Sequence, residues 1–175
     1  MRKKENLYTP NCIRTFSGIY LNVFKLTPSM IEIEDIAHAL SLNCRWGGHI
    51  FKHFSVCQHS INCCDLASEK NKLAALLHDS SEAYILDFPK PIKDKLEDYK
   101  RVENNLMKVI AEKFHFEYPL SKEIKKIDRD ELVKEWNSLM LRREKELPTY
   151  SPKKTKKMFL DRFNYLINKK LKEKK

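Results

Sequence analysis

The stretch LAALLHDSSEA at residues 73–83 combines an apolar run with three ionisable side chains. Its apolar residues predict a buried helix over about 70–84, yet His78 and Asp79 stand side by side within it, and Glu82 follows one turn later. An imidazole beside a carboxylate is costly to bury unless a partner satisfies both groups, and a metal ion does so directly. The stretch therefore predicts a metal site on a core helix, completed by ligands from elsewhere in the chain.

A second histidine lies on the apolar face of the preceding helix, which is expected to begin near residue 55. Positions i, i+3, i+7 and i+10 share one face of that helix, and they are occupied by Val56, His59, Cys63 and Leu66. A lone histidine on an apolar face is more often a core residue than a ligand. Because His78 lies in the next helix, we interpret His59 as a second ligand.

A further carboxylate is expected on a helix over about 121–143. Its inward stripe is predicted to comprise Ile124, Ile127, Leu132, Trp136, Leu139 and Met140. Asp128 lies four residues after Ile124 and four before Leu132, so it faces the core, whereas Asp130 aligns with lysines on the exposed face. Periodicity therefore selects Asp128 as the fourth ligand.

The loop RWGGHIFKHF at residues 45–54 follows a predicted amphipathic helix over about 32–44 and contains two of the three glycines. The guanidinium of Arg45 can bind a phosphate or a sugar hydroxyl, and the indole of Trp46 can stack on a base or sugar. His49 is a further candidate for phosphate contact. The alternative is a helix end with Trp46 serving only as core.

Two prolines shape the segment after the proposed metal helix, LDFPKPIK at residues 86–93. An extended loop here would bring Asp87 and Lys93 back to the mouth of the site. A plain linker between helices is the competing interpretation.

The remaining segments complete an all-α prediction with a short N-terminal arm. Residues 12–30 predict a hairpin or an extended arm, 94–115 a long helix, and 151–175 an amphipathic helix. We expect one domain over 1–150 and a basic C-terminal helix or tail over 151–175.

Charge and composition limit the classes of function. The net charge of +10 arises from residues 1–5 and 153–175, whereas residues 6–152 sum to zero. A basic tail on a neutral body argues against a whole-domain nucleic-acid surface, although weak contact of the tail with nucleic acid stays open. No apolar run suits a membrane helix, and no apolar signal core follows the N-terminal charges. Five cysteines without CxxC spacing favour a reducing compartment, so we expect a cytoplasmic protein.

The order His59, His78-Asp79, Asp128 resembles the H…HD…D signature of the HD-domain metal-dependent phosphohydrolases. Three blocks carry the resemblance further: DIAHALSLNCRWGGHIFKHFSVCQHS, LAALLHDSSEAYILDFPKPIK and IKKIDRDELVKEW. Together they look like a phage and bacterial subfamily that is similar to the bacterial 5′-deoxynucleotidases. The likeness covers roughly residues 15–140.

The resemblance implies an all-α HD bundle, often a homodimer, that holds one divalent ion through His59, His78, Asp79 and Asp128. Glu82 and Asp87 match acids near the attacking water, and Arg45 and Trp46 match a pair that contacts the nucleotide sugar. Two departures are a short interval between the two histidines and the Gly-Gly-His at residues 47–49. The second departure leaves the identity of the substrate open.

A site of two imidazoles and two carboxylates suits Mn, Co, Fe, Ni or Mg, with Zn also acceptable. We therefore expect hydrolysis of a nucleoside 5′-monophosphate, preferentially of a deoxynucleoside, to nucleoside and phosphate. Glu82 or Asp87 would move the proton, while Arg45, Lys93 or His49 would hold phosphate oxygens. The alternatives are an HD-type dNTP triphosphohydrolase and a non-catalytic metal-containing module that binds nucleic acid or a protein partner.

Overall fold

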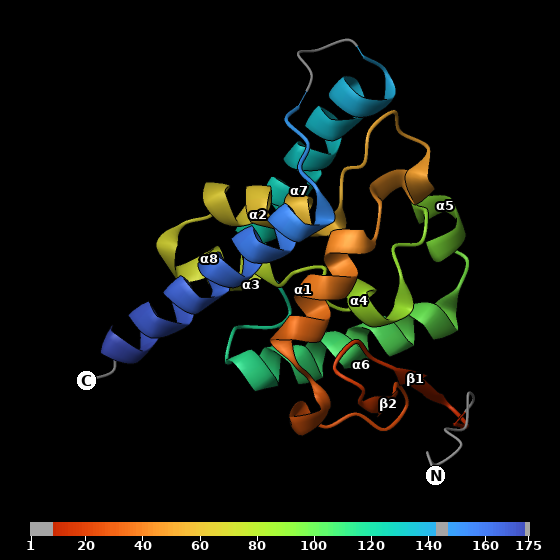
Figure 1. The fold of residues 1–175 in the computed structure, drawn as a ribbon, viewed down its shortest axis with the longest axis vertical. Coiled ribbons are helices and arrows are strands. Elements are labelled where there is room, and N and C mark those ends of the chain that lie inside the picture. The colour runs from red at the N-terminus through yellow and green to blue at the C-terminus, as the bar shows by residue number, and fades with distance from the viewer. Residues whose placement is uncertain (1–8, 143–146, 174–175) are drawn as a thin grey trace.

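A computed structural model describes residues 9–142 and 147–173 of the chain. These residues form eight α-helices and one two-stranded sheet, which confirms the predicted all-α class (Figure 1). Within the described ranges, no helix combines the length and the apolar character that crossing a membrane requires. The basic residues 1–5 and the predicted helix end at 143 lie outside the described residues.

The N-terminal arm is a hairpin of β1 (Cys12–Arg14) and β2 (Tyr20–Asn22), which pair antiparallel. The turn between them passes through Gly18 at φ +92°, a backbone conformation that glycine adopts without strain. Ser17 donates from its backbone N–H and its hydroxyl to the carboxylate of Asp35, at 2.6 and 2.8 Å. This carboxylate belongs to the first helix, so the hairpin is attached directly to the helical body.

Three helices form the centre of the fold: α1 (Ile33–Leu42), α2 (Val56–Leu66) and α8 (Pro152–Glu173). Helix α8 packs on both α1 and α2 (Figure 1). Its inward face contributes Phe159, Phe163 and Leu166 to the main core. The predicted amphipathic helix at the C-terminus is therefore a packed element of the body.

The predicted continuous helix over 70–84 is wrong, because the chain forms α3 (Lys72–Leu76), a turn, and then α4 (Glu82–Ile85). The turn closes through backbone bonds from Ser80 N–H to Leu77 C=O (3.1 Å) and from Glu82 N–H to Asp79 C=O (3.0 Å). Adjacent serines at 80 and 81 compete poorly for helix and favour such turns. His78 and Asp79 thus project from a buried turn instead of a helix face.

The other half of the molecule consists of α5 (Lys90–Lys93), α6 (Glu97–Phe114), α7 (Lys122–Glu135) and a π-helical turn at Trp136–Met140. Ser121 caps α7, since its hydroxyl accepts from the backbone N–H of Ile124 at 3.3 Å. In Figure 1 the segment between α1 and α2 lies between α7 and α5. Residues of all three line one cavity.

The predicted inward stripe of α7 is only partly correct. Ile124 is buried, but the side that faces the core continues through Glu131 and Glu135, while Leu132 and Trp136 are 36% and 40% exposed. The acids replace apolar residues there because each finds a partner on a neighbouring element. Leu66, the last residue of the stripe predicted for α2, is likewise exposed.

Candidate metal centre

The four side chains predicted as ligands converge from three elements. His59 comes from α2, His78 and Asp79 from the turn between α3 and α4, and Asp128 from α7. His59 Nε2 lies 3.1 Å from Asp128 Oδ1, and His78 Nε2 lies 3.2 Å from Asp79 Oδ2. The crossed pairs, His59 with Asp79 and His78 with Asp128, are each separated by 3.8 Å. Two imidazole nitrogens and two carboxylates therefore surround one small volume.

The Nδ1 hydrogen bonds of the two imidazoles turn both Nε2 atoms toward the cluster, where His59 Nε2 lies within hydrogen-bond distance of Asp128 and Cys63. His59 Nδ1 lies 2.6 Å from Glu135 Oε1, and His78 Nδ1 donates to the carbonyl of Ala75 at 2.8 Å. With the proton on Nδ1, each Nε2 presents a lone pair, as in metal-bound histidines whose other nitrogen contacts a carboxylate or carbonyl. His78 Nε2 is buried without a hydrogen-bond partner among the described residues. A cation would satisfy this atom.

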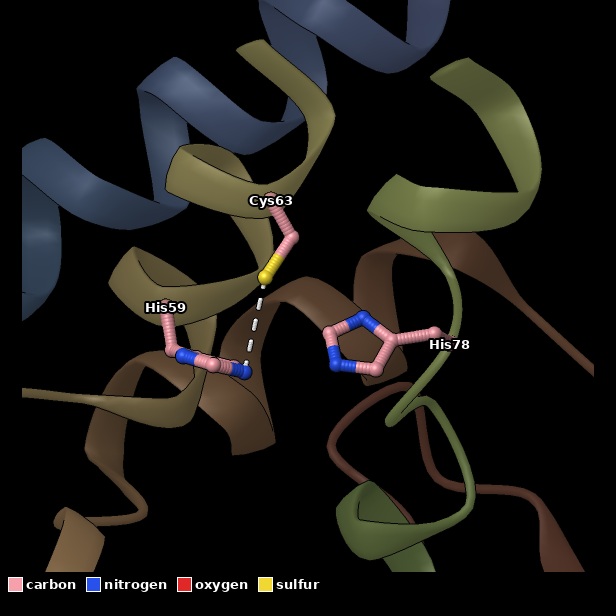
Figure 2. Close-up of side chains that lie close together, drawn as sticks. All are labelled: His59, Cys63 and His78. Carbon is pink, nitrogen blue, oxygen red and sulfur yellow. Dashed lines mark hydrogen bonds between the residues drawn. The ribbon is translucent and has the colours of Figure 1, made fainter. Parts of the chain in front are cut away.

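Cys63 is a further donor at the same place. Figure 2 shows His59 and Cys63 on one face of α2, with His78 approaching from the turn. Cys63 Sγ lies 3.5 Å from His59 Nε2, and donor atoms of the three side chains all lie within 4.8 Å of one another. This group could hold a metal ion. Cys63 was expected on the same helix face as His59 but was not predicted as a ligand; its i+4 spacing from His59 was the available signal.

The electrostatics of the cluster favour added positive charge. Burial opposes protonation of both imidazoles, yet nearby carboxylates, Glu135 and Asp128 for His59 and Asp79 and Asp128 for His78, raise the pKa of each well above its ordinary value. Burial would raise the pKa of Asp79, but the adjacent His78 lowers it to about 2. The acids therefore attract a proton or a cation, and a divalent ion fits this donor set.

Glu135, which was not predicted as a site residue, connects the cluster to Arg45. Its Oε1 accepts from His59, and its Oε2 accepts from Arg45 Nε at 2.7 Å. Arg45 is buried, and its NH1 atom lies 3.9 Å from Asp79 Oδ2. The signal in the sequence was spacing, because Glu135 follows Asp128 by seven residues and so lies on the same face of α7.

A cavity of about 770 Å³ opens beside the cluster. It is lined by two of the converging carboxylates, Asp79 and Asp128, and by the predicted site residues Arg45, Trp46, Glu82, Asp87 and Lys93. His49 is exposed and does not line the cavity, so its position does not support the predicted phosphate contact. The prolines after α4 bring Asp87 and Lys93 to the cavity, where Lys93 donates to Glu103 of α6.

One wall of the cavity is aromatic. The rings of Trp46 and Trp136 lie 5.1 Å apart at an interplanar angle of 52°, and Leu132 lines the same cavity. Trp46 and Gly47 both adopt φ of +60°, which is uncommon for a bulky side chain and reverses the backbone at this point. Leu132 and Trp136 were expected in the core; they instead provide an apolar surface on which a planar ligand can stack.

Two acids of the cavity are suited to proton transfer. Burial raises the pKa of Glu82 well above its ordinary value, and the carboxylates of Asp79 and Asp87 raise it further. Burial likewise raises the pKa of Asp87. Glu82 Oε2 has no hydrogen-bond partner among the described residues, so it is available to a ligand.

Fold and site together define an all-α protein with a candidate metal centre beside a ligand-sized cavity. No family model matches the chain. It is 40% identical over 129 residues to the uncharacterized protein YfdR of Escherichia coli K12, covering 74% of this chain and 72% of YfdR. The chain therefore belongs to the same family as YfdR. It is also 34% identical over 111 residues to the uncharacterized protein RCAP_rcc00048 of Rhodobacter capsulatus, covering 58% of this chain and 57% of that protein.

Proposed function

We propose that this chain is a metal-dependent phosphohydrolase of the HD-domain kind, which hydrolyses a nucleoside 5′-monophosphate, preferentially of a deoxynucleoside, to nucleoside and phosphate. The observation that carries the proposal is the convergence of two imidazole Nε2 atoms and two carboxylates beside a cavity that also presents Arg45 and two acids with raised pKa. Such a combination is typical of hydrolytic sites.

The proposed ligand set comprises His59, His78, Asp79 and Asp128. The side chains of Asp79 and Asp128 are 20% and 44% exposed and line the cavity, whereas Cys63 is fully buried and does not. An ion held by the carboxylates can therefore reach a substrate. This mixed nitrogen and oxygen set suits Mn, Co, Fe, Ni or Mg and also accepts Zn. When bound, the ion supplies an acidified water and neutralises charge on the phosphoryl group.

Glu82 and Asp87 supply the proton transfers that hydrolysis needs. A carboxyl with a raised pKa can receive the proton of the attacking water or donate one to the leaving 5′-oxygen. Glu82 is the more deeply buried of the two and has an unpartnered oxygen, so we assign it the more direct part. Asp87, on the cavity wall, would help to keep the pKa of Glu82 raised through its own negative charge.

Arg45 and Lys93 hold the phosphate. Glu135 occupies the Nε of Arg45, so the terminal nitrogens of the guanidinium are left to donate to phosphate oxygens beside Asp79. Lys93, at the end of α5, lines the same cavity and adds a second positive charge. The aromatic pair of Trp46 and Trp136 would receive the sugar or base.

The charge balance of the cavity favours a monophosphate over a triphosphate. The cations that line it are each paired with a carboxylate, as in Arg45 with Glu135, Lys90 with Asp94, Lys93 with Glu103 and Lys100 with Glu97. A triphosphate would require surplus positive charge, which these residues do not offer. The volume of about 770 Å³ is ample for a nucleotide.

The test is phosphate release from ribo- and deoxynucleoside mono- and triphosphates by metal-stripped protein resupplied with Mn, Co, Ni, Mg or Zn. We expect metal-dependent inorganic phosphate from monophosphates and none from the Asp79→Ala variant. Tripolyphosphate released only from a dNTP would move the assignment to a triphosphohydrolase. No release from any nucleotide, with metal bound stoichiometrically, would contradict the proposal and favour a binding module.

A further inference from the structure

Glu135 is the last residue of α7, and its side chain is completely buried. Each of its two oxygens contacts a cationic or basic group from a different element, namely His59 of α2 at 2.6 Å and Arg45 of the 45–48 turn at 2.7 Å. One carboxylate therefore joins a proposed metal ligand to the proposed phosphate-binding group.

The two contacts have different consequences. Accepting from His59 Nδ1 keeps the proton there and turns Nε2 toward the cluster, and such partners strengthen a ligand's hold on its metal. Accepting from Arg45 Nε fixes the plane of the guanidinium, which leaves NH1 on the side of Asp79. Without Glu135, Arg45 would lose its only short carboxylate contact among the described residues. Of its short carboxylate contacts there, His59 would keep only the 3.1 Å contact with Asp128.

We infer that Glu135 is a positioning residue shared by the metal site and the phosphate site, so that one substitution weakens the binding of both ligands. The phosphate half of this inference rests on one part of the proposed function, the binding of phosphate by Arg45, and does not need hydrolysis; the metal half does not rest on the proposed function. Glu135 itself touches neither ligand; it acts through His59 and Arg45.

The first test measures Mn²⁺ affinity by calorimetric titration of metal-free full-length protein. Glu135→Gln keeps the shape but presents an amide N–H₂ to one of the two donors, so we expect Mn²⁺ to bind about 10–100-fold more weakly. Glu135→Asp retains the charge and should recover part of the loss. The matched control is Glu131→Gln, one turn earlier and also buried, whose carboxylate contacts Lys134 and Asn62 instead.

The second test titrates inorganic phosphate into Mn²⁺-saturated protein. Glu135→Gln should weaken phosphate binding about tenfold, the size of one lost charge-assisted hydrogen bond, while Glu131→Gln leaves it unchanged. Circular dichroism shows whether each variant is folded. If Glu135→Gln does not fold, Glu135→Asp provides the test, with smaller losses of Mn²⁺ and phosphate affinity expected.

Two outcomes would overturn the inference. One is a Mn²⁺ affinity for the Glu135 variants equal to that of Glu131→Gln. The other is a loss of Mn²⁺ affinity with phosphate binding unchanged, which would confine Glu135 to the metal site. If the wild-type protein binds Mn²⁺ and phosphate but hydrolyses no nucleotide, the proposed function fails and the shared role of Glu135 stands.

Discussion

The two imidazoles of the cluster are held by different kinds of acceptor. The Nδ1 atom of His59 contacts a carboxylate, whereas that of His78 donates to a backbone carbonyl in its own turn. His59 is thus the more basic ligand and depends on α7, while His78 depends only on the local conformation of residues 75–78. Asp128 is a proposed ligand that lines the cavity, whereas the buried Cys63, which does not line it, is the alternative ligand.

The identity of the ligands can be tested at Asp128 and Cys63. Losing a ligand should weaken binding more than losing a ligand's partner, which costs about 10–100-fold, so Asp128→Asn should lower Co²⁺ affinity by about 100-fold or more. Cys63→Ser should leave it nearly unchanged. Absorption spectroscopy of the Co²⁺-loaded protein provides the check: an intense near-ultraviolet thiolate band that disappears in Cys63→Ser would show that sulfur binds the ion.

Glu82 should affect turnover without affecting metal binding. Glu82→Gln retains the shape but cannot transfer a proton, so we expect the rate of phosphate release to fall about 10²–10⁴-fold. Mn²⁺ affinity should stay at the wild-type value because Glu82 is not a proposed ligand. A turnover number close to that of the wild type would remove Glu82 from the mechanism.

At the scale of the elements, the helices over 33–42, 56–66 and 97–114 were predictable because each carries a strong 3.6-residue apolar period. Period alone failed for α7, where buried Glu131 and Glu135 occupy the inward face. It failed again at 77–81, where an apolar composition concealed a turn. The failure at α7 arises because a buried polar residue whose partner is distant in sequence cannot be recognised from local pattern, whereas at 77–81 the two adjacent serines were a local turn signal that the apolar run before them outweighed.

The same limit separates the predicted from the missed site residues. The two histidines and two aspartates were found from their positions and from a motif resemblance, and the structure brings all four together. The seven-residue spacing from Asp128 places Glu135 on the same helix face, but its role depends on contacts with residues 76 and 90 positions away, which local pattern does not reveal.

The start of α7 is tied to the turn before α3 by Glu123. Its carboxylate accepts from the backbone N–H of Ser68 at 2.7 Å, from its hydroxyl at 2.9 Å and from Asn71 at 2.6 Å. These hydrogen bonds lower the pKa of Glu123 below its ordinary value. A lowered folded-state pKa contributes stability that is complete above the unfolded-state pKa, about 4.3, and is lost as the pH falls through the folded-state pKa.

Glu123→Gln should therefore lower the Tm at pH 7, and the difference from the wild type should shrink as the pH falls below about 4.3. Thermal unfolding followed by circular dichroism from pH 7 to pH 3 measures it. A difference that stays constant, or that grows toward low pH, would contradict the assigned role of this carboxylate.

At the scale of the whole molecule, the basic C-terminal helix belongs to the body. Arg162 contacts Asp65 of α2 at 2.8 and 2.7 Å, Lys169 contacts Glu69 at 2.6 Å, and Lys156 contacts Glu34 of α1 at 2.9 Å. Part of the positive charge of residues 153–175 is thus paired within the chain. Exposed pairs of this kind add little stability, so apolar packing must attach the helix.

Phe159→Ala should destabilise the entire fold. The phenyl ring is completely buried in the main core, and removing such a ring costs about 3–5 kcal/mol. The control is Tyr165→Ala on the same helix, where the ring is 64% exposed and the expected change is within about 0.5 kcal/mol. Urea unfolding should remain one transition for both variants. A separate early transition confined to α8 would show instead that the helix is a detachable appendage.

The four-ligand metal site can be tested directly with an anomalous difference map from crystals grown with Mn²⁺. We expect one strong peak within coordination distance, about 2.0–2.3 Å, of His59 Nε2, His78 Nε2 and one oxygen each of Asp79 and Asp128, at the edge of the cavity. A fully loaded crystal without a peak there, or with the ion bound to Cys63 and away from both carboxylates, would contradict it.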